Sequence, residues 1–296
     1  MPRLLAYAPP GKEIYPYYCT LMKPVYKIGN SDDLNASQAV LLIEVGEEHC
    51  CFAIVDYANY MIVQSCYYTS EEDDYNDILR KVIEEHKELK QTFRQTVVGY
   101  YTPENILIPS KFYEYEQIKN VLGSLYEKGQ DTTISESIAE WQLYNVYHVP
   151  ATTHGLLSRS FATGNFWHVY SIILKNGIEQ NEGGSLVIDF KKTNFSVIAT
   201  RNNSLLLAQI FSYSTAADVL YWLLKTCQEY SLSQDEVSLK LSGLIDKRSS
   251  VFKELHQYFR NLEFAILEND IQLSVDFNEY PVHFFSSIYK LASCVS

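Results

Sequence analysis

The sequence lacks the long apolar run that a membrane-spanning helix needs. Its longest apolar runs, such as AVLLI and YSIILK, fall far short of about 18 residues. The opening stretch MPRLLAYAPPGKEIYPYYC has no long apolar segment and is interrupted by Pro9, Pro10 and Pro16, so we predict no secretory signal peptide. We therefore expect a cytoplasmic protein with no membrane span.

Positive charge is also in short supply. The chain has 24 Lys and Arg against 36 Asp and Glu, which gives a formal net charge of −12. An acidic surface repels phosphates, so we expect no nucleic-acid partner. The 47% hydrophobic content of the 296 residues is too high for a disordered chain and is enough for one large or two medium domains.

Several motifs that carry chemistry are missing. The sequence contains no CxxC, HExxH, GxSxG, GxGxxG or P-loop pattern. Cys50 and Cys51 are adjacent in a strand-like run, where neighbouring side chains point to opposite faces, so they make a poor chelate. His148 and His154 flank Pro150, and we predict no metal site there.

The sequence does contain an internal repeat. A shift of 145 residues places 41–45 over 186–190, 52–54 over 197–199 and 61–64 over 206–209. Each copy predicts an apolar strand that ends in an acid, a polar turn, a second strand, another turn, a third strand and then a helix. We expect these helices to begin near Ser70 and after Thr215, where Thr215 and Asp218 have the spacing of a capping box.

The order of later elements is also the same in both copies. We predict strands over 95–101 and 237–241 and helices over 111–125 and 249–261, then strands over 142–149 and 271–276 and helices over 165–174 and 283–292. This is the ribonuclease-H-like topology. We therefore predict an α/β fold of two such halves, each with a mixed five-stranded sheet, flanking a cleft. The expected division is an N-terminal arm over 1–34, a first half over 35–176 and a second half over 184–296.

Four stretches carry a resemblance to known proteins: Leu186–Phe190, Phe211–Thr215 with Asp218, Leu241–Gly243, and Tyr101–Pro109. With the duplicated pattern, they are similar to the actin-like ATPase superfamily. From about Asn35 to the C-terminus, the chain more closely resembles a bacterial family of unknown function with an actin-like ATPase fold. The resemblance implies the fold and no established reaction.

Active members of that superfamily bind Mg-ATP between the halves with two hairpins, each carrying an acid, a glycine and a hydroxyl residue. The first hairpin here keeps Glu44 and Gly46, but Glu47 and Glu48 stand at its tip. Each of these carboxylates near a triphosphate costs roughly 1 kcal/mol in water and several times more near a protein surface. This hairpin is therefore a poor phosphate cradle.

The second hairpin keeps Asp189 and adds Lys191, Lys192 and Thr193, but it has no glycine. Its lysines suit an anion, and they are equally typical of a solvated hairpin tip. After the fourth strand of this half, only Gly243 stands where active members tend to carry paired glycines. A single glycine after a strand serves any tight turn.

We therefore predict a binding or scaffold module without catalysis and without a cofactor. The alternative is an Mg-ATP-binding or ATP-hydrolysing protein in which Glu44 and Asp189 place Mg²⁺ and Lys191 or Lys192 holds phosphate. We expect a protein partner, and the sequence leaves open whether that partner is a second copy of the chain in a homodimer. The 24 tyrosines leave two interpretations open, since their clusters suit either a protein interface or the covering of sheet surfaces and the domain junction. The candidate cofactor-binding residues for the alternative are Glu44, Gly46, Asp189, Lys191, Lys192, Thr193 and Gly243.

Overall fold

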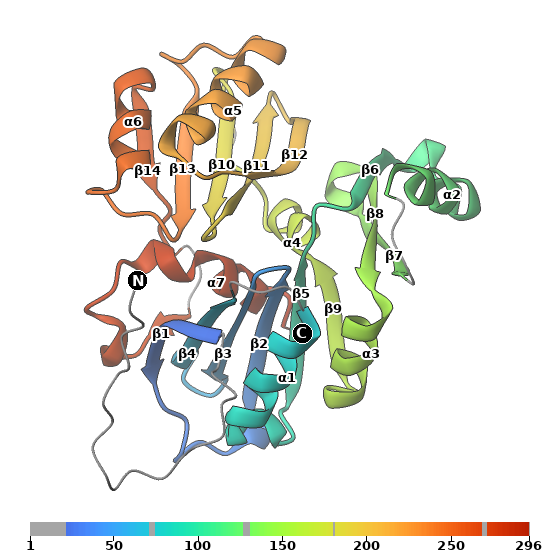
Figure 1. The fold of residues 1–296 in the computed structure, drawn as a ribbon, viewed down its shortest axis with the longest axis vertical. Helices are drawn as coiled ribbons and strands as arrows, with labels where there is room; N and C mark the ends of the chain where they lie inside the picture. Colours follow the sequence, from blue (N-terminus) through green and yellow to red (C-terminus); the bar gives the residue numbers. More distant parts are fainter. Residues whose placement is uncertain (1–21, 71–74, 127–130, 180, 268–270, 296) are drawn as a thin grey trace, which may run out of the picture.

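The computed structural model describes residues 22–70, 75–126, 131–179, 181–267 and 271–295. Within these residues the strands form three sheets, and two of them lie one above the other in Figure 1. The lower sheet has seven strands in the order β1-β4-β3-β2-β5-β9, with β15 beside β4. They are β1 (Met22–Gly29), β2 (Ala39–Gly46), β3 (His49–Asp56), β4 (Met61–Ser70), β5 (Gln95–Tyr101), β9 (Gly164–His168) and β15 (Gln272–Leu273).

The upper sheet has five strands in the order β12-β11-β10-β13-β14. They are β10 (Ser185–Phe190), β11 (Asn194–Arg201), β12 (Ser204–Ser212), β13 (Ser238–Gly243) and β14 (Asn261–Phe264). Helices α5 (Ala216–Glu229) and α6 (Ser250–Tyr258) cover one of its faces, where Leu186, Ile188 and Phe190 are buried in a shared apolar core. The expected capping box of α5 is confirmed, because Thr215 and Asp218 each bond to the other's backbone N–H.

The repeat is confirmed by strand register. Ile43 lies opposite Phe52 in the first half and Ile188 lies opposite Val197 in the second, both at the predicted shift. The third strands depart from that alignment by two residues, since the β3–β4 turn spans 57–60 and the β11–β12 turn only 202–203. Asn202 and Asn203 both have positive φ, which this shorter turn requires and asparagine tolerates.

The fifth strand of the first half is β9, where we predicted a helix over 165–174. The chain is strand through His168 and helix only in α4 (Val169–Lys175), with the His168 ring accepting a bond from the Tyr170 N–H. The prediction was wrong because 166–174 is almost continuously apolar, and such a run hides the boundary between a buried strand and a buried helix.

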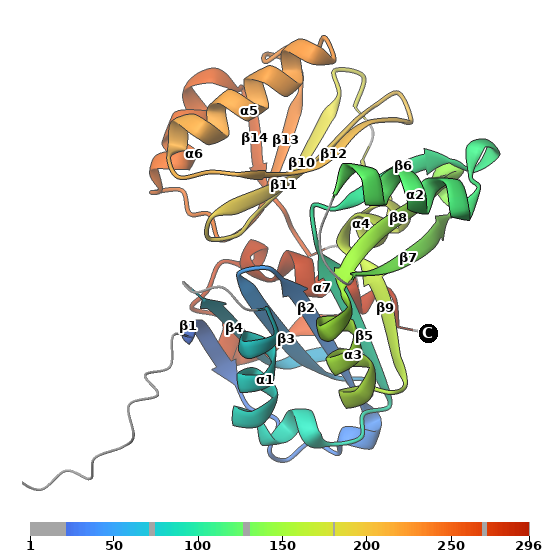
Figure 2. The same ribbon diagram turned by 45° about the vertical axis from the view of Figure 1, so that its right-hand side comes forward.

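The strand predicted over 142–149 belongs to a separate small sheet. β8 (Leu143–Pro150) pairs with β6 (Asn105–Pro109) and β7 (Asp131–Ile138), and α2 (Tyr115–Leu125) packs against β8. This unit lies to one side of both larger sheets in Figure 2. The prediction of a five-stranded sheet is therefore wrong for the first half. β9 takes the place of the strand predicted over 142–149, and β1 and β15 bring the sheet to seven strands.

The end of the chain returns to the first sheet. β15 runs parallel to the start of β4, and α7 (Ser286–Ala292) packs against β2 and β5. The predicted division counted all of 184–296 in the second half, whereas β15 pairs with the first sheet and α7 contacts both the first sheet and β13 of the second. Of the predicted arm over 1–34, β1 pairs with β4 and residues 1–21 lie outside the described residues.

The remaining helices complete the layers. α1 (Tyr75–Glu85) and α3 (Ala151–Ser160) lie on one side of the first sheet, and α4 and α7 lie between the two sheets in Figures 1 and 2. Among the described residues, no helix is both long and apolar enough to cross a membrane. The short 3₁₀ turns are η1 (Ala36–Gln38), η2 (Lys87–Lys90), η3 (Ser110–Phe112), η4 (Ala139–Trp141), η5 (Val275–Phe277) and η6 (Val282–Phe285).

Candidate functional site

Strand alternation directs the acids of both halves toward the space between them. Val40 and Leu42 of β2 pack in the core that includes α7, and Glu44 follows on the same face. In β10, Val187 packs against α4, and Asp189 follows on that face. The two hairpins therefore face one another, as the predicted cleft requires.

Lys191 joins the two hairpins. Its Nζ lies 2.5 Å from Glu44 Oε1 and 2.8 Å from Asp189 Oδ2. The Ser242 hydroxyl donates to the other Asp189 oxygen at 2.8 Å. Glu44, Lys191 and Asp189 are 0, 3 and 6% exposed, so the Lys191 ammonium group forms buried ion pairs with carboxylates from opposite halves.

Electrostatics keeps this group charged. Burial opposes ionisation of Glu44, but the Lys191 charge and the His49 hydrogen bond outweigh it and lower the Glu44 pKa to about 2. Burial likewise opposes the charge of Lys191, and the Asp189 and Glu44 carboxylates overcome this and raise its pKa well above the usual value. The Glu44 charge is thus stabilised by Lys191 of the other half, and the Lys191 charge by Asp189 of its own half and by Glu44.

His49 completes the first hairpin. Its Nε2 lies 3.0 Å from Glu44 Oε1, and burial lowers the pKa of its ring, so the neutral imidazole donates this bond. A Cβ on Gly46 would lie 2.2 Å from His49 Cε1. Gly46 therefore makes room for the histidine ring, whereas in the Mg-ATP alternative a glycine here would allow close approach of a phosphate.

The other predicted residues of the second hairpin have different surroundings. The Thr193 hydroxyl bonds to the Glu48 carboxylate across the gap, while Lys192 is exposed at the tip. Gly243 has φ +77°, and a Cβ there would lie 2.2 Å from the Phe190 carbonyl oxygen. Gly243 thus allows close passage of β10 and β13 backbones.

This arrangement does not fit Mg-ATP. The cavity beside Glu44 and Asp189 has a volume of about 20 Å³, room for one water. Small-molecule sites usually have roughly 300–1,000 Å³. The position between the two acids, where they would place a metal ion, is taken by the Lys191 ammonium group.

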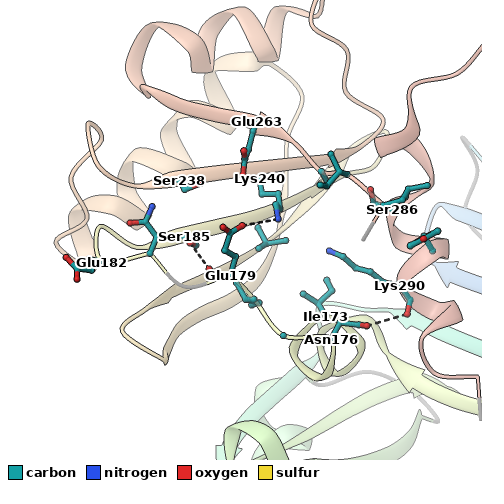
Figure 3. Close-up of a pocket in the computed structure, with 18 residues that line it drawn as sticks. Ile173, Asn176, Glu179, Glu182, Ser185, Ser238, Lys240, Glu263, Ser286 and Lys290 are labelled. Atoms are coloured by element: carbon teal, nitrogen blue, oxygen red, sulfur yellow. Dashed lines mark hydrogen bonds and ion pairs between the residues drawn. The ribbon is translucent and has the colours of Figure 1, made fainter. Parts of the chain in front are cut away.

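A larger pocket of about 470 Å³ lies elsewhere between the halves (Figure 3). It is bounded by residues 176–179 and 181–182 of the connection, the starts of β10 and β13, the loop after β14, and α7. Lys240 pairs with Glu179 at 3.5 Å on one side of it. Ser286 also lines it, and its buried hydroxyl has no hydrogen-bond partner in the part of the chain that the structure describes.

The family described as "Protein of unknown function (DUF3822)" matches residues 29–262. The chain belongs to this family. No curated protein matches the sequence. A Bacteroides thetaiotaomicron protein with actin-like ATPase fold and unknown function has a similar structure, with TM-score 0.69 and 16% identity over 80% of this chain and 94% of that one. The structure of a PilM–PilN type IV pilus biogenesis complex matches with TM-score 0.52 and 12% identity over 88% of this chain and 99% of that one.

These similarities show that the DUF3822 protein has the actin-like ATPase fold, as predicted. Of the candidate residues, Glu44, Asp189, Lys191 and Thr193 meet between the halves. The role of Lys191 as the bridge was missed. Its position two residues after Asp189 was an available signal, because residues i and i+2 of a strand point to the same side.

Three further residues of this DUF3822 site were also missed: His49, Glu48 and Ser242.

The tyrosines near the site favour the interpretation in which the tyrosine clusters cover sheet surfaces and the domain junction. Tyr67 stacks on His49 with ring centres 5.5 Å apart, and Tyr101 lies 5.1 Å from Lys191 Nζ; both tyrosines are buried.

Proposed function

We propose that this DUF3822 protein is a binding module without ATPase activity, whose two halves are held together by a buried ion pair. The observation that carries the proposal is the Lys191 ammonium group between Glu44 and Asp189. A lysine in this position supplies internally the positive charge that a metal ion would otherwise bring.

The pocket between the halves is the best place for a ligand or a partner's side chains. It has the volume of a small-molecule site and combines polar groups with apolar ones such as Ile173 and Val187. Ile266, which is 68% exposed, lies at this pocket and offers apolar contact area. A fold relative solved as a complex with another protein supports a protein partner. We place this activity in the bacterial cytoplasm.

Calorimetric titration with Mg-ATP tests the absence of nucleotide chemistry. We expect no heat of binding and no shift in melting temperature at millimolar Mg-ATP, for the wild type and for Asp189→Ala alike. Micromolar binding that Asp189→Ala abolishes would overturn the proposal. Asp235→Ala is the matched control, because this aspartate is exposed in the same half and lies before β13, outside both hairpins.

Affinity capture from the native cytosol tests partner binding. Ile266→Lys adds charge at the pocket, whereas Tyr221→Lys changes an exposed residue of α5, which covers the opposite face of the second sheet. We expect a partner retained by the wild type and by Tyr221→Lys to be lost with Ile266→Lys. Equal retention by all three proteins would exclude the pocket as the binding surface.

One observation favours ATP binding as the second candidate. Glu44 and Asp189 come from the two equivalent hairpins and converge on a single atom, Lys191 Nζ. Separation of the halves would free both acids for Mg²⁺ and the lysine for phosphate. The same titration decides between the candidates.

A further inference from the structure

Three ionisable side chains outside the interdomain site meet on the small sheet. Glu104 precedes β6, Asp131 begins β7, and His148 lies near the end of β8. Each offers one ligand atom, and the three atoms lie within 4.8 Å of one another. We infer that Glu104, Asp131 and His148 form a binding site for a divalent transition-metal ion such as Zn²⁺.

The pairing of the small sheet explains why these residues meet. Asp131 lies opposite Pro150 and Thr133 lies opposite His148, so Asp131 and His148 are diagonal neighbours on one face. The His148 backbone N–H donates to the Glu104 carbonyl at 2.9 Å, which fixes the third residue beside them. The site therefore rests on strand register, which holds its geometry.

Unsatisfied polar atoms point to a missing ligand. His148 is 7% exposed, and its Nδ1 is buried without a hydrogen-bond partner among the residues described. Asp131 Oδ2 is also buried, and the described part of the chain provides it no partner either. Buried polar atoms are rarely left unpaired, and a bound cation would satisfy a ring nitrogen and a carboxylate oxygen together.

The donor set selects the kind of cation. One imidazole nitrogen with two carboxylate oxygens suits Zn²⁺ and similar transition metals, whereas Mg²⁺ and Ca²⁺ prefer oxygen ligands alone. Ligands about 2.1 Å from Zn²⁺ at tetrahedral angles lie roughly 3.4 Å apart, so a modest contraction completes the site. Three protein ligands leave a coordination position open for water or a small ligand.

Calorimetric titration of EDTA-treated protein with ZnCl₂ tests the site. We expect one Zn²⁺ per chain, and binding at least tenfold weaker in both His148→Ala and Glu104→Gln. His256→Ala is the matched control, because this histidine is exposed on α6 in the other half and its loss should leave binding unchanged. Addition of Mg²⁺ at millimolar concentration should not displace the zinc.

Cobalt provides a second readout for the same variants. Co²⁺ in a four-coordinate site of nitrogen and oxygen ligands gives intense visible absorption bands, which should appear with the wild type and with His256→Ala but not with Glu104→Gln. Because Glu104 is half-buried, we expect Glu104→Gln to fold, so it tests the metal site even if His148→Ala does not fold. Absence of zinc binding to the wild type, or undiminished binding by folded His148→Ala or Glu104→Gln, would overturn the inference.

Discussion

Glu136 lies in β7 of the small sheet and has a buried carboxyl group. Its Oε1 accepts hydrogen bonds from the Tyr147 hydroxyl at 2.5 Å and from the His168 backbone N–H at 2.9 Å. Burial raises the Glu136 pKa to about 7, in spite of these bonds. Glu44, which is equally buried, has its pKa lowered because Lys191 lies beside it. The difference between the two acids is the presence of a partner charge.

This raised pKa predicts a pH dependence of stability. At a pH below 4.5, the ordinary pKa of this carboxyl, the group is protonated in both the folded and the unfolded chain. Its contribution to the free energy of unfolding is then fully present. As pH rises toward 7 the unfolded chain loses the proton first, so the free energy of unfolding falls. Between pH 5 and pH 8 we expect ionisation of Glu136 to lower the free energy of unfolding by about 2–3 kcal/mol.

Urea unfolding of the wild type and Glu136→Gln at both pH values measures that loss. Glutamine keeps an acceptor for Tyr147 and His168 but does not titrate, so the wild type should lose about 2–3 kcal/mol more than the variant. The comparison cancels the opposite contribution of buried histidines such as His168, whose pKa burial lowers to about 4. Parallel losses in the two proteins would show that Glu136 ionises normally.

At the scale of single elements, glycine has opposite roles in a strand end and in a helix. Gly243 ends β13 with φ +77° and leaves no space for a Cβ. Gly123 lies inside α2 on its exposed side, and a Cβ there would have no neighbour within 4 Å. The same substitution should therefore have opposite effects at the two positions.

We predict that Gly123→Ala raises the free energy of unfolding by about 0.5–1 kcal/mol, because alanine restricts the unfolded chain and favours helix. Gly243→Ala should lower it by more than about 2 kcal/mol, through strain at positive φ and a clash with Phe190. Chemical denaturation of each variant gives both values. A destabilising Gly123→Ala would mean that α2 contacts something beyond its own sheet.

Elements were predictable from sequence where a local pattern was sufficient. β2 and β10 are apolar runs with an acid near the end, and the capping box of α5 is a four-residue signal. The boundary between β9 and α4 was not predictable, because His168 alone marks it within an almost continuously apolar run. β7 was missed because its sequence DTTISESI is polar, and its burial comes from packing rather than from alternation.

At the scale of the whole molecule, several features join the halves in the part of the chain that the structure describes. The chain crosses between them twice, before β10 and after β14, and α4 packs against both halves. A further feature is the bridge from Lys191 to Glu44, which links residues far apart in sequence. The i, i+2 spacing places Lys191 on the side of Asp189, but no local pattern predicts Glu44 of the other half as its second partner.

The bridge predicts how the two halves respond when its cation is removed. Lys191→Met leaves Glu44 and Asp189 buried, charged and facing one another from opposite halves. Breaking a buried pair in this way typically costs about 3–5 kcal/mol, and the remaining repulsion favours separation of the halves. We expect that loss in urea unfolding, together with a larger radius of gyration by small-angle X-ray scattering.

Lys192→Met is the matched control for this prediction, since it removes the same charge from the adjacent exposed position. It should change the free energy of unfolding by less than about 0.5 kcal/mol and leave the scattering unchanged. If Lys191→Met behaved like this control, the other contacts between the halves, including the α4 and α7 packing, would be enough to hold them together. A loss confined to Lys191→Met, with expansion, would instead identify the ion pair as the contact that keeps the cleft closed.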